Sequence, residues 1–364
     1  MATQHRERLE AVRRRLVEEN LEAVFFTHLP NVRYLSGFTG SAATICITRS
    51  GAWILTDFRY WEQAAREAPD FTLYRLPSRR FAEILPEFLV EIGSPRRAAF
   101  ESAHLTVDQW MSWKEATPDT EWIPIKDWIE TLRAVKKDNE LDYLREAARI
   151  ADDAVTYLRR RLRPGMTERE AAWLAERYIR THGGEREAFD IIVASGPNAA
   201  MAHHPSGSHR LKIGEPIIVD LGVRVNGYHS DITRTFILGR MSRRFQKLYE
   251  VVLRAQEAAI RNMRAGMSGK EIDALARAVI QEAGYADAFG HGLGHGIGLE
   301  IHERPFIGPV SEDPVPAGAV FTVEPGIYLH GWGGIRIEDM VVIDIDGVRE
   351  VLTRASRDPR IPVR

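Results

Sequence analysis

Apolar residues recur along the chain at two spacings, which divide it into two regions. Up to about residue 125, a charged helical segment is followed by short apolar runs that alternate with further helix, among them EAVFF, ATICIT and AWILTD. Short apolar runs bounded by polar turns are typical of buried strands. This first region is therefore predicted to be a compact α/β unit.

A long amphipathic helix is predicted to open the second region. The stretch RAVKKDNELDYLREAARIADDAVTYLRRRL, residues 133–162, has a charged start and then apolar residues at helical spacing. A chain of 364 residues also favours two domains, because single cores rarely grow beyond roughly 250–300 residues. We expect an N-terminal α/β domain at 1–129 and a second domain at 130–364, in a mixed α/β (α+β) fold.

The second region repeats one pattern of helix followed by strand. The two copies are 163–179 with 214–222, and 264–280 with 318–326. Each helix begins with a capping box, Ser or Thr followed three residues later by Glu, and each strand carries one acidic residue at the same place. This repetition predicts an internal duplication with pseudo-twofold symmetry.

Composition excludes several classes of protein. With 49 Lys plus Arg against 51 Asp plus Glu, the chain has no overall positive charge for nucleic acid. The single cysteine, Cys46, excludes an internal disulfide and a cysteine-based zinc site, and is expected to be a small core residue in a reducing compartment. The N-terminus is too charged for a signal peptide, and no apolar run approaches the ~20 residues of a membrane span. We expect a cytoplasmic protein with no nucleic-acid or membrane partner.

The segment GHGLGHGIGLEIHERP, residues 290–305, has glycine at every second position at its start. The glycines at 290, 292, 294 and 296 would together cost about 4 kcal/mol in a helix, and the glycine spacing does not match a dinucleotide-binding loop. Alternating glycine permits close backbone approach and leaves His291, Leu293 and His295 to project, as on an extended strand. A metal centre with its substrate would fit beside such a strand.

A hairpin brings two aspartates together in VDLGVRVNGYHSDITRTF. The pair Asn226-Gly227 is a strong type I′ turn signal, and a two-residue loop sets the register of both strands. In that register Asp231 lies opposite Gly222 and diagonal to Asp220 on one face of the sheet. Two like charges on one face require a cation between them.

The second copy supplies a matching acidic pair, Glu324 in FTVEPG and Glu338 in GIRIED. Unpaired ionised carboxylates are costly to bury in apolar strands, so each is expected to bind a metal or shift its pKa. A lone histidine or aspartate usually has a structural role, but the duplicated pairs together favour metal chemistry. Four carboxylates with one or two histidines suit two divalent ions, Mn²⁺ first and Co²⁺, Zn²⁺ or Fe²⁺ as alternatives.

These residues lie in motifs that also carry a family resemblance: FDIIVASGPNAAMAHHP, VDLG, YHSDITRTF, GHGLGHGIGLEIHERP, TVEPGIYL and GIRIEDMVV. In this order they resemble the pita-bread metallopeptidases, in the branch of Xaa-Pro dipeptidase (prolidase) and aminopeptidase P. Because GFTGS and TDFRY resemble the family's N-terminal domain, the resemblance covers almost the whole chain. It implies a creatinase/prolidase-like N-terminal domain followed by a pita-bread catalytic domain.

The resemblance implies a role for each site residue. The ligands of two metal ions would be Asp220, Asp231, His295, Glu324 and Glu338, with Asp231 and Glu338 bridging. The substrate site would include His203, His291 and His302, with Arg336 in the same network. We choose His203 over the adjacent His204 because His203 stands 17 residues before Asp220, the interval associated with the family.

The resemblance also implies a reaction. A metal-bridging hydroxide would attack the carbonyl before a proline nitrogen of a di- or oligopeptide, because coordination lowers the pKa of water to about 7. Glu324 would shuttle the proton, and His203 and His302 would stabilise the oxyanion. A homodimer is expected by the same resemblance.

Two departures leave the peptide length open. Phe58 stands where glycine is expected in the TDxRY motif, and Phe306 stands where prolidases place a carboxylate-binding arginine, although Arg304 is close by. The chain is therefore predicted to be either a dipeptidase or an aminopeptidase acting on longer peptides.

Three alternative functions fit parts of the same sequence. A methionine aminopeptidase shares the catalytic fold, but the additional N-terminal region favours the prolidase side. Creatinase-like relatives keep the fold without metal, whereas all five ligand positions here hold metal-binding residue types. A non-catalytic pita-bread module that binds a protein partner would have lost ligands in the same way.

Overall fold

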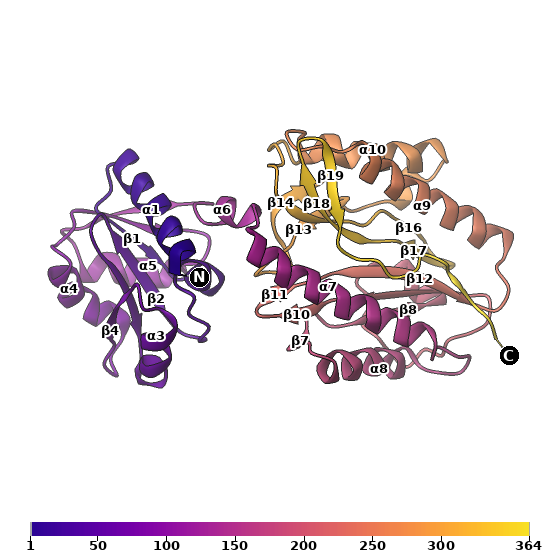
Figure 1. The fold of residues 1–364 in the computed structure, drawn as a ribbon, viewed down its shortest axis with the longest axis horizontal. Coiled ribbons are helices and arrows are strands. Elements are labelled where there is room, and N and C mark those ends of the chain that lie inside the picture. The colour runs from indigo at the N-terminus through magenta and orange to yellow at the C-terminus, as the bar shows by residue number, and fades with distance from the viewer. Residues whose placement is uncertain (1, 364) are drawn as a thin grey trace. The chain divides into compact units, whose positions relative to one another are not determined.

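The computed structural model describes residues 2–363 and divides the chain into two compact units, Met1–Leu132 and Arg133–Arg364 (Figure 1). Within the described residues, we find no helix that combines the length and apolar character needed to cross a membrane.

The N-terminal unit is built on one six-stranded sheet in the order β4-β3-β2-β1-β5-β6. Its strands are β1 (Ala23–Phe26), β2 (Thr44–Thr48), β3 (Ala52–Thr56), β4 (Thr72–Arg75), β5 (Arg97–Glu101) and β6 (Glu121–Ile125). Its helices are α1 (Ala2–Glu18), α2 (Leu29–Ser36), α3 (Trp61–Glu67), α4 (Phe81–Glu91) and α5 (Val107–Ala116), with the short helix η1 (Phe58–Tyr60). The three predicted apolar runs form β1, β2 and β3, and Cys46 is fully buried among them, as expected.

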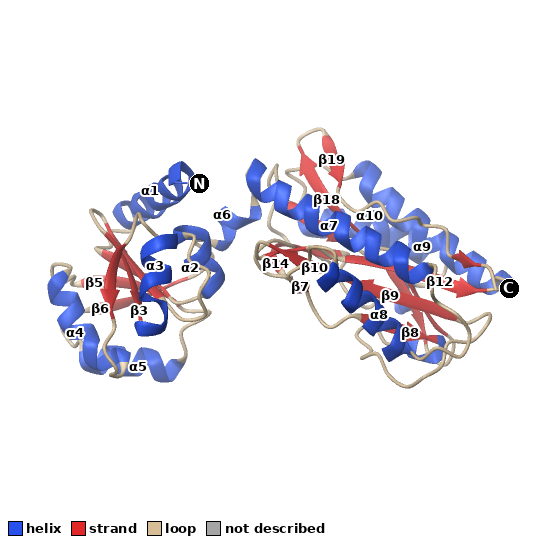
Figure 2. Cartoon of the chain, turned by 60° about the horizontal axis from the view of Figure 1, so that its bottom comes forward, coloured by secondary structure: helices blue, strands red, loops and turns tan. Residues whose placement is uncertain are grey.

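The C-terminal unit has two pairs of long helices with its strands between them (Figures 1 and 2). The helices are α7 (Asp138–Arg159), α8 (Glu168–Thr181), α9 (Arg243–Asn262) and α10 (Gly269–Glu282), with η2 (Gly196–Ala200) and η3 (Ala286–Ala288), and the short α6 (Glu130–Ala134) spans the boundary between the units. The first half of the strands comprises β7 (Arg186–Glu187), β8 (Ile192–Ser195), β9 (Pro216–Leu221), β10 (Val223–Val225), β11 (Tyr228–His229) and β12 (Ile232–Leu238). The second half comprises β13 (Gly294–Gly296), β14 (Glu303–Ile307), β15 (Val320–Val323), β16 (Gly326–Leu329), β17 (Gly333–Arg336), β18 (Asp339–Asp344), β19 (Gly347–Val351) and β20 (Arg360–Ile361).

The predicted duplication is visible in the structure. A four-stranded sheet, β20-β12-β9-β8, packs with α7 and α8, and a five-stranded sheet, β14-β13-β15-β18-β19, packs with α9 and α10. Both capping boxes form: Thr167 accepts from the backbone of Glu170, and Ser268 accepts from that of Glu271. Each half has its own apolar core.

The predicted hairpin has the expected turn and register. Asn226 and Gly227 have φ values of 46° and 75°, the left-handed conformation that a type I′ turn requires at both positions. The register continues across the gap between β11 and β12, where Thr233 pairs with Asp220. Asp231 is thereby placed diagonal to Asp220, as the loop length predicted.

The glycine-rich segment contains a strand, as predicted, rather than a helix. Strand β13 lies between β14 and β15. A side chain at Gly294 would collide with the carbonyl oxygen of Thr322, and one at Gly296 with the carbonyl oxygen of Arg304. Glycine is therefore required here because two neighbouring backbones approach too closely for a Cβ atom.

Candidate active site

A single cavity of about 670 Å³ in the C-terminal unit brings together every site residue predicted from the sequence. These residues are His203, Asp220, Asp231, His291, His295, His302, Glu324, Arg336 and Glu338. They come from six separate segments of both halves of the duplication, so the cavity lies where the two halves meet.

The four carboxylates reach the cavity from equivalent places in the two halves. Asp220 lies in β9 and Asp231 immediately precedes β12, while Glu324 follows β15 and Glu338 lies between β17 and β18. The Nε2 atom of His295, in β13, is 3.4 Å from Glu324 Oε1 and 3.7 Å from Asp231 Oδ2. One ligand atom each of Asp231, His295 and Glu338 lie within 4.8 Å of one another, close enough to share an ion.

These acids are buried with too few donors. Burial raises the pKa of Asp231 and Glu338 well above their ordinary values, and repulsion from neighbouring carboxylates raises them further. Burial likewise raises the pKa of Glu324 to about 7. Within the described residues, no hydrogen-bond donor reaches Asp220 Oδ1 or Asp231 Oδ1. Buried carboxylate oxygens without donors are what a bound divalent cation would satisfy, so the donor set fits a metal site.

The two histidines of the glycine-rich strand are kept neutral. Burial lowers the pKa of His291 to about 4 and that of His295 to about 3. A neutral imidazole has a free lone pair, which is the form that binds a metal ion. The ring of His302 stands 4.1 Å from that of His295, nearly perpendicular to it, and reaches the cavity from the following loop.

Arg336 and Tyr328 link the two halves beside the carboxylates. Arg336 donates from Nη2 to Asp220 Oδ2 at 2.6 Å and from Nη1 to Tyr328 Oη at 2.8 Å. The Tyr328 hydroxyl lies 3.0 Å from His291 Nε2, so one network joins Asp220 to His291. Sequence reasoning missed Tyr328, because nothing in the pattern of β16 distinguishes it from a core tyrosine.

Two threonine hydroxyls, also missed, orient the second acidic pair. Thr233 donates to Glu338 Oε2 at 2.7 Å, and Thr322 donates to Glu324 Oε1 at 3.1 Å. Strand alternation could have indicated Thr233, since it lies two residues after Asp231 and therefore on the same face of the strand.

The adjacent His203 and His204 differ in their surroundings. Both line the cavity, but His204 Nε2 stands 3.3 Å from Glu168 Oε2, a carboxylate with no exposed surface. Glu168 also accepts hydrogen bonds from the loop around these histidines, through Ser195, Asn198 and the backbone of Gly207. His204 Nε2 has no hydrogen-bond partner within the described residues, so its contact with Glu168 is one of proximity, and the choice of His203 over His204 stays a prediction. The sequence showed Glu168 only as the first residue of a capped helix.

The positions that depart from the family pattern lie outside the carboxylate network. Arg304 donates to Asp313 at 2.8 Å, and the side chain of Phe306 is half exposed. Phe58 is 72% exposed on η1 of the N-terminal unit.

Comparison with known proteins agrees with this geometry. Residues 142–344 match Metallopeptidase family M24, and residues 8–135 match the Creatinase/Prolidase N-terminal domain. The Xaa-Pro dipeptidase of Pyrococcus furiosus is 35% identical over 354 residues, covering 97% of this chain and 99% of that protein.

Solved structures extend the similarity to the fold. The Xaa-Pro dipeptidase from Bacillus anthracis superposes with a TM-score of 0.94 at 37% identity, over 99% of this chain and 100% of the other. An X-Pro aminopeptidase from Thermotoga maritima superposes with a TM-score of 0.87 at 36% identity, over 94% and 98%. The chain therefore belongs to metallopeptidase family M24, with a creatinase/prolidase-type N-terminal domain, and is a metal-dependent peptidase.

Proposed function

We propose that this enzyme hydrolyses the peptide bond between an N-terminal residue and proline, in dipeptides or in longer peptides. The observation that carries the proposal is the pair of buried aspartate oxygens that no donor of the described residues reaches, in a cavity that is also lined by five histidines. The named activities of the similar dipeptidases and aminopeptidase support the choice of an Xaa-Pro bond.

Two divalent ions, Mn²⁺ first among them, would be held by Asp220, Asp231, His295, Glu324 and Glu338. When bound, such a pair lowers the pKa of a water molecule to about 7, which supplies a nucleophile for hydrolysis at neutral pH. Thr233 and Thr322 keep Glu338 and Glu324 in place by donating one hydrogen bond to each carboxylate.

The remaining residues would bind the peptide and manage its charge and protons. His203 and His302 line the cavity and would donate hydrogen bonds to the oxyanion that develops at the scissile carbonyl. Glu324 would carry the proton to the leaving proline nitrogen. The Arg336–Tyr328 pair fixes the hydroxyl that faces His291 Nε2, and the carbonyl oxygen of Gly292 lies 2.8 Å from His291 Nδ1, so both contacts would hold the ring in one tautomer beside the substrate.

The wall of the cavity is suited to a proline ring. Phe189, Ile191, Ile192 and Ile301 provide apolar lining in addition to the polar residues. A proline nitrogen inside a peptide has no hydrogen to donate, so selection for proline must rely on shape and apolar contact.

A panel of peptides tests the proposal. Metal-depleted enzyme, reloaded separately with Mn²⁺, Co²⁺ or Zn²⁺, would be assayed on Ala-Pro, Ala-Pro-Ala and, as a matched control, Ala-Ala. We expect hydrolysis of a proline peptide and little of Ala-Ala, with about two equivalents of metal bound per chain. Preference for Met-Ala-Ser would instead indicate methionine aminopeptidase chemistry, and protein without metal or turnover would indicate a binding module.

The proposal extends to a cytoplasmic homodimer, the form expected from the family resemblance. Sedimentation equilibrium of the metal-loaded protein would measure its oligomeric state directly. A monomer at micromolar concentration would contradict this part of the proposal without affecting the chemistry.

A further inference from the structure

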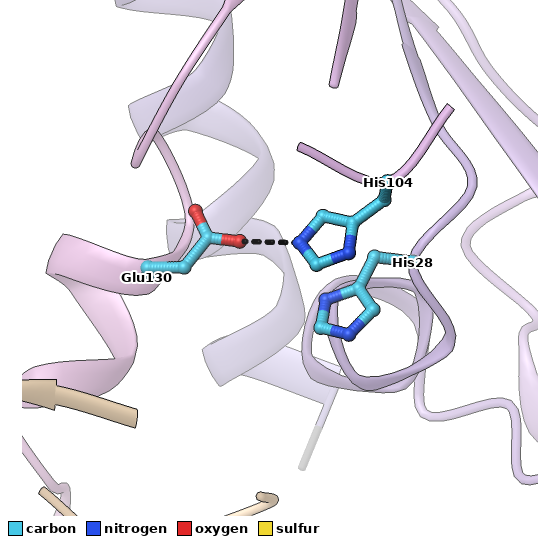
Figure 3. A group of neighbouring side chains, drawn as sticks. All are labelled: His28, His104 and Glu130. Carbon is cyan, nitrogen blue, oxygen red and sulfur yellow. Dashed lines mark ion pairs between the residues drawn. The ribbon is translucent and has the colours of Figure 1, made fainter. Parts of the chain in front are cut away.

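A second group of metal-ligand side chains lies in the N-terminal unit. His28, His104 and Glu130 each offer one ligand atom, and these three atoms lie within 4.8 Å of one another. Figure 3 shows the two imidazoles one above the other, with the carboxylate of Glu130 facing the edge of the His104 ring. All three residues belong to the unit Met1–Leu132, whereas the catalytic residues belong to the other unit.

The three side chains come from three different segments. His28 is the N-cap of α2, His104 lies in the loop between β5 and α5, and Glu130 opens α6. The His104 Nε2 atom stands 3.8 Å from Glu130 Oε1. Ligand atoms around a tetrahedral zinc ion are about 3.3–3.5 Å apart, since each lies about 2.0–2.2 Å from the metal. Only a small movement would therefore bring these two atoms to ligand distance.

The imidazole rings are stacked, with centroids 3.6 Å apart and planes 5° from parallel. For both rings to point a nitrogen at one ion they must turn apart. Rotation about the final side-chain torsion of histidine is soft enough to allow this.

Hydrogen bonds from neighbouring residues hold Glu130 and His28 in position. Asn31, fully buried, donates from Nδ2 to Glu130 Oε1 and to Glu101 Oε1, both at 2.6 Å. Glu101 in turn accepts the backbone N–H of His28 at 2.9 Å, which holds that residue in place. Hydrogen bonds that orient the ligating side chains in this way are characteristic of protein metal sites.

The surroundings suit an ion rather than a larger molecule. The adjoining cavity, lined by Glu101, His104 and Glu130, has a volume of only about 60 Å³. The side chains of His104 and Glu130 are 31% and 19% exposed, so a water molecule can complete the coordination from the solvent side. Two imidazoles and one carboxylate are ligands that Zn²⁺ and similar transition metals prefer.

We infer that His28, His104 and Glu130 form a binding site for one divalent transition-metal ion, of which Zn²⁺ is the representative, in the N-terminal unit. The bound ion would join the start of α2, the loop after β5 and the start of α6. Its role is structural: by binding the folded unit only, it would stabilise that unit against unfolding.

The test is a difference in metal content between full-length proteins. Wild type, His104→Ala and Glu130→Gln would be depleted with a chelator, reloaded with Zn²⁺, passed through gel filtration and analysed for zinc. Gln at position 130 can still accept the hydrogen bond from Asn31. Glu130→Gln is therefore expected to fold even if His104→Ala does not. The matched control is His182→Ala, which removes another exposed histidine, one stacked on Tyr178 in the catalytic unit.

We expect the wild type and His182→Ala to retain one equivalent of zinc more than either cluster variant. Zn²⁺ should also raise the melting temperature of the N-terminal unit by roughly 3–8 °C in the wild type and much less in the variants. The inference would be overturned if all four proteins held the same amount of zinc. It would also be overturned if His182→Ala lost as much zinc as the two cluster variants. Because the four chains share the same catalytic residues, this result is readable whether or not the proposed peptidase activity is found.

Discussion

Two buried carboxylates are adjacent at the start of β18 and differ in the groups that surround them. Asp339, with no exposed surface, accepts from Arg234, Arg357, Gln256 and Thr353 at 2.6–2.7 Å. Glu338, only 1% exposed, accepts from the neutral hydroxyl of Thr233 and lies beside further acids.

The pKa values express this difference. Burial alone would raise the pKa of Asp339, but attraction to Arg234 and Arg357 outweighs it and lowers the pKa. For Glu338, burial and repulsion from Glu324 act together and raise the pKa well above its ordinary value. Asp339 is thus neutralised by two arginines of the protein, whereas the charge of Glu338 would have to be neutralised by a bound cation. A site built to hold metal ions requires that arrangement.

The largest effect is expected when the charge of one proposed metal ligand is removed. Asp231→Asn keeps the size of the side chain but removes its charge, so we expect turnover of Ala-Pro to fall about 10⁴-fold or more, about 5.4 kcal/mol in activation free energy. Metal content should fall while the circular dichroism spectrum stays unchanged. A variant with normal turnover and two bound metals would contradict the assignment of Asp231.

The matched substitution at the carboxylate that is paired with arginines is Asp339→Asn. It leaves Arg234, only 1% exposed, without its carboxylate, so the free energy of unfolding should fall by about 3–5 kcal/mol, measured by urea denaturation of the metal-loaded protein. Because the folded-state pKa of Asp339 is lowered, its stabilising effect is present above the unfolded-state value of about 3.9 and is lost as pH falls through the folded-state pKa. The variant should therefore differ less from wild type at acid pH. Loss of metal with unchanged stability would reverse the proposed roles of the two acids.

Removing the metal should lower the stability of the catalytic unit, because its buried carboxylates would then lack a cation. With ions at 100 to 1,000 times their dissociation constant, binding contributes about 2.7–4.1 kcal/mol to stability, so a chelator should lower the melting temperature of the catalytic unit. Calorimetric scans before chelation, after chelation and after addition of Mn²⁺ would measure this, with Asp231→Asn as the control that responds less. An unchanged melting temperature after complete depletion would show that these acids do not depend on a cation.

The smallest effect is expected at Glu168, which holds the loop of His203 and His204. Glu168→Gln should lower kcat/KM for Ala-Pro about tenfold, about 1.4 kcal/mol, with metal content unchanged, because the loop loses a charged acceptor behind the substrate histidine. The control is Glu170→Gln, an exposed member of the capping box on the same helix turn. If both variants lose equal activity, the effect reflects helix stability rather than loop placement.

Local features of the fold were accessible to the sequence because local chemistry determines them. The capping boxes at Thr167 and Ser268 and the type I′ turn at Asn226-Gly227 depend on residues a few positions apart. Since strand side chains alternate, the turn also determined that Asp220 and Asp231 share one face. The alternation of glycine before His295 likewise identified an extended segment, and the family motifs supplied the roles of the site residues, which stay predictions.

Only the tertiary structure decided which charged residues obtain partners. Glu338 and Asp339 are adjacent acids in the chain, and nothing local shows that Arg234, more than 100 residues earlier, pairs with Asp339 while Glu338 lines the cavity. The same holds for Glu168 with His204, and for His28, His104 and Glu130, whose segments are brought together by the fold. Pairing of buried charges depends on which backbones pack side by side. A sequence therefore shows the candidates for a site, while packing determines which of them are neutralised by protein and which are left for a metal.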